Sequence, residues 1–188
     1  DEHTITSLKQ QGAKIGVWGV GTRLVTAFDD PALGGVYKLT AMRRKDGAWQ
    51  PELKLSEQAA KISSPGIHQV RRFREGAGFI GDAIYDTDEP EPNEWVIVDP
   101  ADVTRRKTFP ATAASEDLLI PVMQKGALRF HPPPLVESQA RCREQLASFH
   151  SGIKRFLNPH EYPAGLELRL HERKLTLIAA ARRELGKP

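Results

Sequence analysis

Residues 16–22 read GVWGVGT, and this glycine-rich turn after a short apolar run decides the fold that we expect for the start of the chain. The run 15–18 predicts a short buried strand that leads directly into the turn. Before it, Ile5 and Leu8 have the spacing of a short amphipathic helix, and Gly12 is placed to end that helix. A helix, a buried strand and a glycine turn in this order indicate an α/β layer with a parallel sheet.

An antiparallel β-rich region is predicted to follow at residues 34–130. Strands are expected at 35–43, 49–55, 69–74, 79–85 and 95–98. Asp46 and Gly47 favour a hairpin turn between the first two strands, because glycine adopts a positive φ at no steric cost. The apolar run 118–123 is followed by a further short strand and turn at 124–128.

Helices are predicted for the C-terminal part of the chain. The sequence HPPP at 131–134 breaks the chain before an expected helix over 135–149. A terminal helix is expected over 166–185, with Leu166, Leu170 and Leu177 on one face. The fold class is therefore α/β and antiparallel β mixed, α+β overall. We expect three regions: 1–33, 34–130 and a helical C-terminal extension at 131–188.

The composition restricts the class of protein. The chain has 188 residues, a formal net charge of +3 and 39% hydrophobic residues. Its longest apolar runs, 118–123 and 175–181, are much shorter than the roughly 18 residues of a membrane-spanning helix, so no membrane span is expected. The single cysteine, Cys142, excludes an internal disulfide and is expected to be a buried thiol in a reducing, cytoplasmic compartment. Residues 1–12 show no signal peptide, and a start at Asp1 is expected for a piece of a longer chain or for a processed chain.

Acidic residues, histidines and basic residues are candidates for metal sites or for an interaction surface. Residues 82–102 contain eight acidic residues and no Lys or Arg, which we interpret as a solvated loop, and their spacing matches no calcium-binding loop. None of the six histidines forms an i, i+4 pair with another, so no metal site is predicted. Residues 141–188 carry ten basic residues and five glutamates. A basic interaction domain for nucleic acid or a membrane surface is therefore one alternative function.

Gly19, Val20, Gly21 and Thr22 are the candidate phosphate-binding residues. A phosphate at the end of a strand needs backbone N–H groups that converge on it, and glycines allow this close approach because they lack a Cβ. The hydroxyl of Thr22 can donate one more hydrogen bond. A tight turn without a ligand is the alternative for a bare Gly-x-Gly sequence.

Basic residues after the loop supply candidate cations for a phosphate-rich ligand. They are Arg23, Lys38, Lys54 and Lys61. Ammonium and guanidinium groups bind phosphate as point charges or as forked donors. Solvated surface residues are the alternative for each of them, and a non-catalytic phosphate- or nucleotide-binding module is a second alternative function.

The sequence resembles nicotinate phosphoribosyltransferases in blocks that occur in order along the whole chain. The longest read VWGVGTRLVT at 17–26 and DPALGGVYKL at 30–39. Shorter blocks follow: KLSE at 54–57, SPG at 64–66, FIGD at 79–82, PV at 121–122, KG at 125–126, REQL at 143–146 and LNP at 157–159.

The resemblance implies an enzyme that couples nicotinate with phosphoribosyl pyrophosphate to form nicotinate mononucleotide in NAD salvage. It implies Mg²⁺ and ATP as cofactors, with ATP hydrolysis through a phosphorylated histidine. Family members are usually much longer, so the chain is expected to be their C-terminal portion and to be inactive by itself. Residues 1–33 then end an irregular type II phosphoribosyltransferase α/β barrel, and residues 34–130 supply β-sandwich strands.

The resemblance also assigns roles to residues. Gly21 and Thr22, with Gly19 and Val20 shaping the turn, are expected to bind the 5′-phosphate of the sugar donor. Possible diphosphate and ATP contacts are Lys38, Lys54 and Lys61. The phosphorylated histidine and the aromatic residues that stack on nicotinate belong to the N-terminal part of the family, so no catalytic residue is expected here. The expected partners are nicotinate, phosphoribosyl pyrophosphate, ATP and the missing N-terminal part, in a homodimer, with no nucleic acid and no membrane.

Overall fold

A computed structural model describes residues 1–29, 31–32, 35–43, 45, 47–58, 61–184 and 186. The chain divides into two units, Asp1–Tyr37 and Lys38–Pro188, called unit 1 and unit 2 below. The predicted boundary between residues 33 and 34 lies outside the described residues, as does Asp46 of the predicted hairpin turn. The expected mixture of α and β structure is confirmed, because the described residues form four helices and a six-stranded sheet.

Unit 1 contains two short helices. Helix α1 (Glu2–Gln10) begins at Asp1, whose side chain accepts a hydrogen bond from the backbone N–H of Thr4 at 2.9 Å. The chain leaves this helix through Gly12, which has a φ of +82°. Helix α2 (Thr22–Thr26) has five residues and ends at Ala27 in the left-handed conformation. The predicted first helix and its glycine stop are confirmed.

The predicted strand over residues 15–18 is wrong. Residues 13–20 have no regular secondary structure, and Val17 is 89% exposed. A strand needs a neighbour for its backbone hydrogen bonds, and the described residues of unit 1 supply none. The segment is apolar in sequence, but it does not adopt the buried strand conformation that this pattern predicted.

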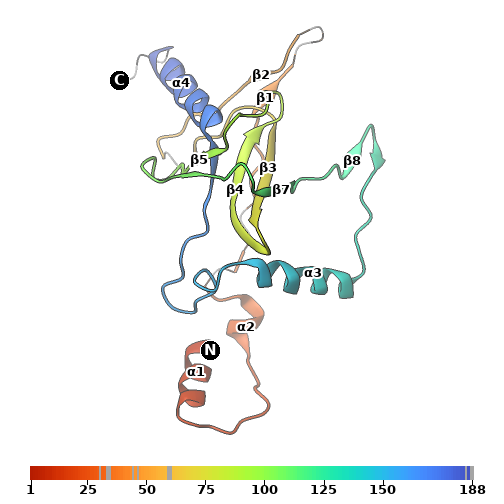
Figure 1. The fold of residues 1–188 in the computed structure, drawn as a ribbon, viewed down its shortest axis with the longest axis vertical. Coiled ribbons are helices and arrows are strands. Elements are labelled where there is room, and N and C mark those ends of the chain that lie inside the picture. Colours follow the sequence, from red (N-terminus) through yellow and green to blue (C-terminus); the bar gives the residue numbers. More distant parts are fainter. Residues whose placement is uncertain are drawn as a thin grey trace. The chain divides into compact units, whose positions relative to one another are not determined.

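Unit 2 is built on a six-stranded sheet with the order β6-β5-β10-β4-β3-β7. Figure 1 labels β3, β4, β5 and β7 of this sheet. The strands are β3 (His68–Glu75), β4 (Gly78–Asp86), β5 (Val96–Val98), β6 (Arg106–Thr108), β7 (Ala114–Asp117) and β10 (Ala164–Glu167). Strands β3 and β4 form the predicted antiparallel hairpin, and β5 is the predicted strand at 95–98. Strand β10 pairs parallel with β4 and antiparallel with β5, so it joins the two parts of the sheet.

Two further pairs of strands are short. Strands β1 (Ala41–Met42) and β2 (Gln50–Pro51) are antiparallel, so the two strands predicted at 35–43 and 49–55 pair as expected but are only two residues long. Strands β8 (Met123–Gln124) and β9 (Ala127–Leu128) flank Lys125 and Gly126, which both have positive φ. The predicted turn at 124–128 is confirmed, because paired positive φ values are typical of a two-residue hairpin.

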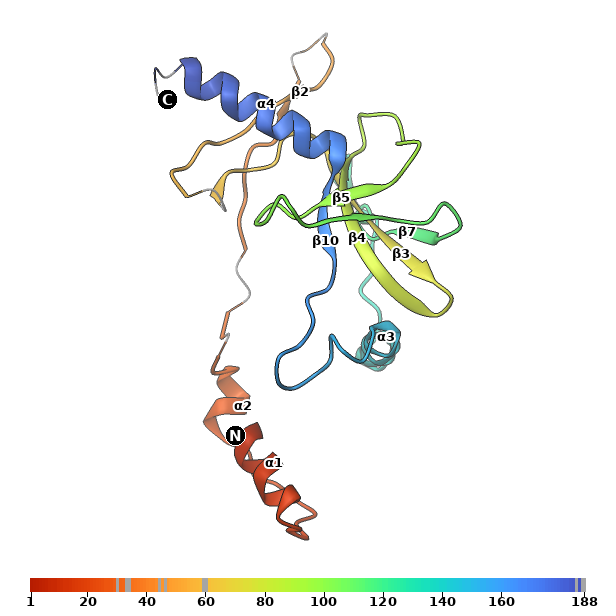
Figure 2. The ribbon, with the colours of Figure 1, turned by 60° about the vertical axis from the view of Figure 1, so that its left-hand side comes forward.

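Helices α3 (Leu135–Ser148) and α4 (Leu168–Glu184) complete unit 2. Helix α3 confirms the prediction for 135–149 and lies at the tip of the β3–β4 hairpin (Figure 2). The terminal helix begins later than predicted, because residues 164–167 form β10. The prediction for Cys142 is also wrong: its side chain is exposed on α3, since no described residue of this helix is buried.

A buried core cluster of unit 2 is formed largely by side chains from strands of the sheet. It consists of Phe73, Ala83, Ile97 and Phe109, with Trp95 packed against it. The rings of Phe73 and Phe109 stack with their centroids 4.0 Å apart. Aromatic pairs at this distance contribute beyond the apolar area that they bury.

Two acidic residues of the segment 82–102 are buried in ion pairs, which corrects the prediction of a solvated loop. Asp82 accepts two hydrogen bonds from the guanidinium of Arg72, at 2.9 and 2.7 Å, and both side chains are less than 15% exposed. Asp86 accepts from Arg173 of α4 at 2.9 Å. A buried carboxylate needs such partners, because an unpaired buried charge is strongly destabilising.

Two findings about the described residues concern metal ligands and membrane-spanning helices. In the part of the chain that the structure describes, no group of three or more His, Cys, Asp or Glu side chains could hold a metal ion. No described helix combines the length and the apolar character that crossing a membrane requires.

Gly165 in β10 gives a direct test of this arrangement. A Cβ at residue 165 would lie 2.4 Å from the backbone oxygen of Val98 on β5, and backbone cannot move aside easily. We expect Gly165→Ala to reduce the free energy of unfolding by about 3 kcal/mol. The control is Gly78→Ala, where the nearest atom is 3.7 Å away. Equal unfolding free energies for the two variants, measured in urea, would contradict the placement of β10.

Candidate functional site

The candidate phosphate loop lies at the start of α2 in unit 1. Gly21 is the residue before the helix, and no side chain caps it. The Gly21 carbonyl accepts from the backbone N–H groups of Leu24 and Val25 at 3.1 and 3.2 Å. Among the described residues, no acceptor binds the backbone N–H groups of residues 20–23.

The loop is also open to solvent. A Cβ built on Gly19 or Gly21 has no atom within 4 Å, and the Thr22 side chain is exposed. Unpaired N–H groups at the beginning of a helix attract anions, since the helix dipole is positive there. With only five residues, α2 has a small dipole, so the N–H groups themselves are the main contribution of the loop.

Arg23 is the cation nearest to the loop in sequence. Its guanidinium lies over the ring of Phe28, 4.2 Å from the centroid, and 3.9 Å from the Asp1 carboxylate. Arg23 and Phe28 border a small cavity of about 270 Å³, which Glu2 and Asp29 also line. Arg23 is thus already near carboxylates, which reduces its value as a free cation for a phosphate.

The three predicted lysines belong to unit 2, where they meet at the segment 61–64. The Nζ of Lys38 donates to the backbone oxygen of Lys61 at 2.8 Å. The backbone N–H of Lys54 donates to the Oγ of Ser63 at 2.7 Å, and the Lys54 side chain is exposed. The structure thus brings the Lys38 ammonium and the backbone of Lys54 to the segment that begins at Lys61, whereas Gly19, Val20, Gly21 and Thr22 belong to the other unit.

Lys174 of α4 also lies at the segment 61–64, and no sequence pattern predicted this contact. Its Nζ donates to the backbone oxygen of Ile62 at 3.2 Å and to the Oγ of Ser64 at 3.4 Å. Burial, and then the nearby charge of Lys38, lower the pKa of the Lys174 ammonium below its usual value. Lys174 lies more than a hundred residues away in sequence, so only the position of α4 on the sheet reveals this contact.

Three arginines of unit 2 that lie on or against the sheet are paired with carboxylates. Arg71, Arg72 and Arg173 each contact a carboxylate at 2.9 Å or less. By contrast, no carboxylate of a described residue forms an ion pair with the lysines that lie in or contact the segment 61–64, which are Lys38, Lys54, Lys61 and Lys174. A group of cations without counterions attracts anions, because a nearby negative charge lowers its electrostatic energy.

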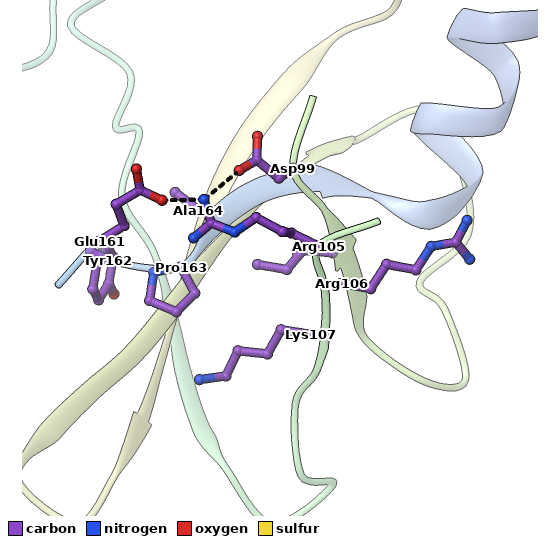
Figure 3. Close-up of a pocket in the computed structure, with 9 residues that line it drawn as sticks. Asp99, Arg105, Arg106, Lys107, Glu161, Tyr162, Pro163 and Ala164 are labelled. Atoms are coloured by element: carbon purple, nitrogen blue, oxygen red, sulfur yellow. Dashed lines mark hydrogen bonds and ion pairs between the residues drawn. The ribbon is translucent and has the colours of Figure 1, made fainter. Parts of the chain in front are cut away.

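A cleft of about 500 Å³ is a separate feature of unit 2 (Figure 3). Arg105 reaches between Asp99, at 3.4 Å, and Glu161, while Arg106 extends in the opposite direction (Figure 3). The Tyr162 hydroxyl donates to Asp82 at 2.8 Å, and burial together with this bond raises its pKa, so it stays protonated. Because two carboxylates neutralise Arg105, the cleft has mixed charge and does not present converging cations.

The chain is similar to proteins of one family over most of its length. The family model described as "Nicotinate phosphoribosyltransferase C-terminal domain" matches residues 67–174. The nicotinate phosphoribosyltransferase of Bacillus subtilis is 35% identical over 170 residues, which are 88% of this chain and 34% of that protein. The human nicotinate phosphoribosyltransferase is 32% identical over 174 residues, which are 90% of this chain and 31% of that protein. The chain therefore spans about a third of the length of the curated relatives that it matches.

A solved structure agrees with these matches. The crystal structure of human nicotinic acid phosphoribosyltransferase superposes with a TM-score of 0.56 at 27% sequence identity. The match covers 78% of this chain and 27% of the human chain.

The lysine group leads to a prediction about one pKa. Lys38→Met removes a positive charge near Lys174, so the pKa of Lys174 is expected to rise toward its usual value, though not fully, because burial is the larger cause. The pKa is measured by an NMR titration of the lysine side chains. The control is Lys154→Met, since the Nζ of Lys154 donates to the Leu146 oxygen at 2.9 Å without contacting this group. The same Lys174 pKa in both variants would show that Lys38 does not act on it.

Proposed function

This chain belongs to the nicotinate phosphoribosyltransferase family, and we propose that it is the C-terminal part of an enzyme that makes nicotinate mononucleotide. The substrates are nicotinate and phosphoribosyl pyrophosphate, and pyrophosphate is the second product. The proposal places the enzyme in NAD salvage. It is supported by the names of the relatives and by the share of their length that the chain spans.

The unpaired N–H groups of residues 20–23 are the observation that carries the role of this chain in the reaction. We propose that Gly19, Val20, Gly21 and Thr22 bind the 5′-phosphate of phosphoribosyl pyrophosphate. That phosphate is distant from C1 of the ribose, where pyrophosphate leaves. Binding energy from such a remote group positions the reacting carbon and so contributes to the rate.

Lys38, Lys54 and Lys61 are proposed to contact the diphosphate or ATP. Mg²⁺ and ATP belong to the proposed reaction: Mg²⁺ would assist the departure of pyrophosphate, and hydrolysis of ATP to ADP and phosphate would drive the reaction. The described residues include no group of acidic or histidine ligands that fits a metal ion. From the family we propose that the ligands of Mg²⁺ lie mostly, and the catalytic residues entirely, in the part of the enzyme outside this chain.

Unit 1 supports the proposal that a larger structure covers it. None of its described residues is buried, and Val17, Leu24 and Val25 are between 69% and 89% exposed. A segment of this size cannot bury enough apolar surface to be stable alone. In the proposed enzyme, residues 1–33 complete an α/β barrel, residues 34–130 supply the strands packed against it, and two complete chains form a homodimer.

An assay of the chain alone and of the complete enzyme tests this function. The complete enzyme is expected to form nicotinate mononucleotide from nicotinate, phosphoribosyl pyrophosphate and MgATP, as measured by chromatography of the products. The 188-residue chain alone is expected to form none. Turnover by the chain alone would contradict its proposed role, and no turnover by the complete enzyme would contradict the proposed reaction.

A substitution in the loop tests the phosphate site. In the complete enzyme, Gly21→Val is expected to raise the KM for phosphoribosyl pyrophosphate about tenfold, because the side chain fills the space in front of the N–H groups. The control is Gly16→Val, at a second exposed glycine with no atom within 4 Å of its Cβ. Similar KM values in the two variants would count against the loop as the phosphate site.

A further inference from the structure

Two lysine ammonium groups from distant parts of unit 2 bind neighbouring atoms of one short segment. Lys38 donates to the oxygen of Lys61 at 2.8 Å, and Lys174 donates to the oxygen of Ile62 at 3.2 Å. Lys38 precedes β1, whereas Lys174 lies in the second turn of α4. Their positive charges are close enough that Lys38 contributes to the lowered pKa of Lys174.

The hydrogen-bond inventory of these groups leaves donors available. Each ammonium has three N–H donors. Lys38 uses one of them, on the Lys61 oxygen, and Lys174 uses two, on Ile62 and Ser64. Among the described residues, therefore, two N–H donors of Lys38 and one of Lys174 have no protein acceptor. All the acceptors used are uncharged, so the positive charges remain uncompensated.

Partial burial strengthens the electrostatic repulsion between the two ammonium groups. Both side chains are partly buried, and desolvation is the main cause of the lowered Lys174 pKa. Two like charges held in a partly dry environment repel each other more strongly than in bulk water. A bound anion would remove this repulsion and use the remaining donors. In the Arg105 cleft, by contrast, Asp99 and Glu161 are ion-paired with the guanidinium of Arg105, although Arg106 and Lys107 also line that cleft.

We propose that Lys174 and Lys38 form a two-cation site over the segment 61–64 for a condensed phosphate, meaning a diphosphate or a longer polyphosphate group. The choice of ligand rests on the proposed function, in which both the sugar donor and a product carry a diphosphate. Two ammonium groups that bind the backbone oxygens of successive residues, 61 and 62, can each contact one of two linked phosphoryl groups, whereas an orthophosphate offers only one. The new element is Lys174, which reaches the site from the C-terminal helix.

Binding of inorganic pyrophosphate to the 188-residue chain, measured by calorimetry, tests the proposal. Lys174→Met and Lys38→Met are each expected to weaken binding about tenfold, because each removes one charged donor and keeps the aliphatic length. Lys174→Arg retains the charge and is expected to keep more affinity than Lys174→Met. The matched control, Lys154→Met, removes a surface lysine that also donates to a backbone oxygen, and it is expected to change the affinity less than twofold. Orthophosphate is expected to bind more weakly than pyrophosphate.

Several results would overturn the proposal. They are no pyrophosphate binding by the unaltered chain, an unchanged affinity in Lys174→Met, or equal losses in Lys174→Met and Lys154→Met. Thermal unfolding of each variant shows whether a loss of binding reflects a loss of fold. In the complete enzyme, the inhibition constant of pyrophosphate is the second measurement, and Lys174→Met is expected to raise it about tenfold.

Failure of this site and failure of the proposed function give different results. If nicotinate mononucleotide forms normally and Lys174→Met leaves the pyrophosphate inhibition constant unchanged, the lysine site is wrong and the function stands. If the complete enzyme makes no nicotinate mononucleotide while the chain binds pyrophosphate through Lys174, the function is wrong and the anion site stands.

Discussion

The position of β10 between β4 and β5 is the constraint on which unit 2 depends. Strand β10 supplies a parallel neighbour to β4 and an antiparallel neighbour to β5, so without it the pair β5–β6 would have no backbone hydrogen bonds to the rest of the sheet. The approach is so close that residue 165 must be glycine, because the Val98 backbone occupies the place of a Cβ. The C-terminal segment is thus part of the sheet and not an appendage to it.

The same strand fixes the position of α4, which begins at the next residue. Arg173 then reaches the buried carboxylate of Asp86, and Lys174 reaches the segment 61–64. The two contacts have different consequences. The first pairs a cation with an anion and so permits Asp86 to be buried. The second adds a cation to a place where Lys38 already supplies one, which is a poor arrangement for stability and a useful one for binding an anion.

Local patterns were sufficient for some elements and insufficient for others. Alternating residues around a glycine turn predicted the β3–β4 hairpin, and the proline run predicted the start of α3. Strand β10 was missed because Leu166 and Leu170 also have the spacing of a helix, although the alternating sequence GLELRL at 165–170 was a signal for a strand. Lys38 and Lys61 could be selected from the sequence, but the contact of Lys174 with the neighbouring Ile62 and Ser64 could not. It depends on a long-range pairing of strands, which no local pattern contains.

Native-state hydrogen exchange of unit 2 is the measurement that tests the role of β10 most directly. If β10 holds the sheet together, its amide hydrogens and those of β4 will exchange only through the same global opening, with the same free energy. If the amides of β10 and α4 exchange through a much less costly opening while the β3–β4 hairpin stays protected, the C-terminal segment is a peripheral addition and the central claim is wrong.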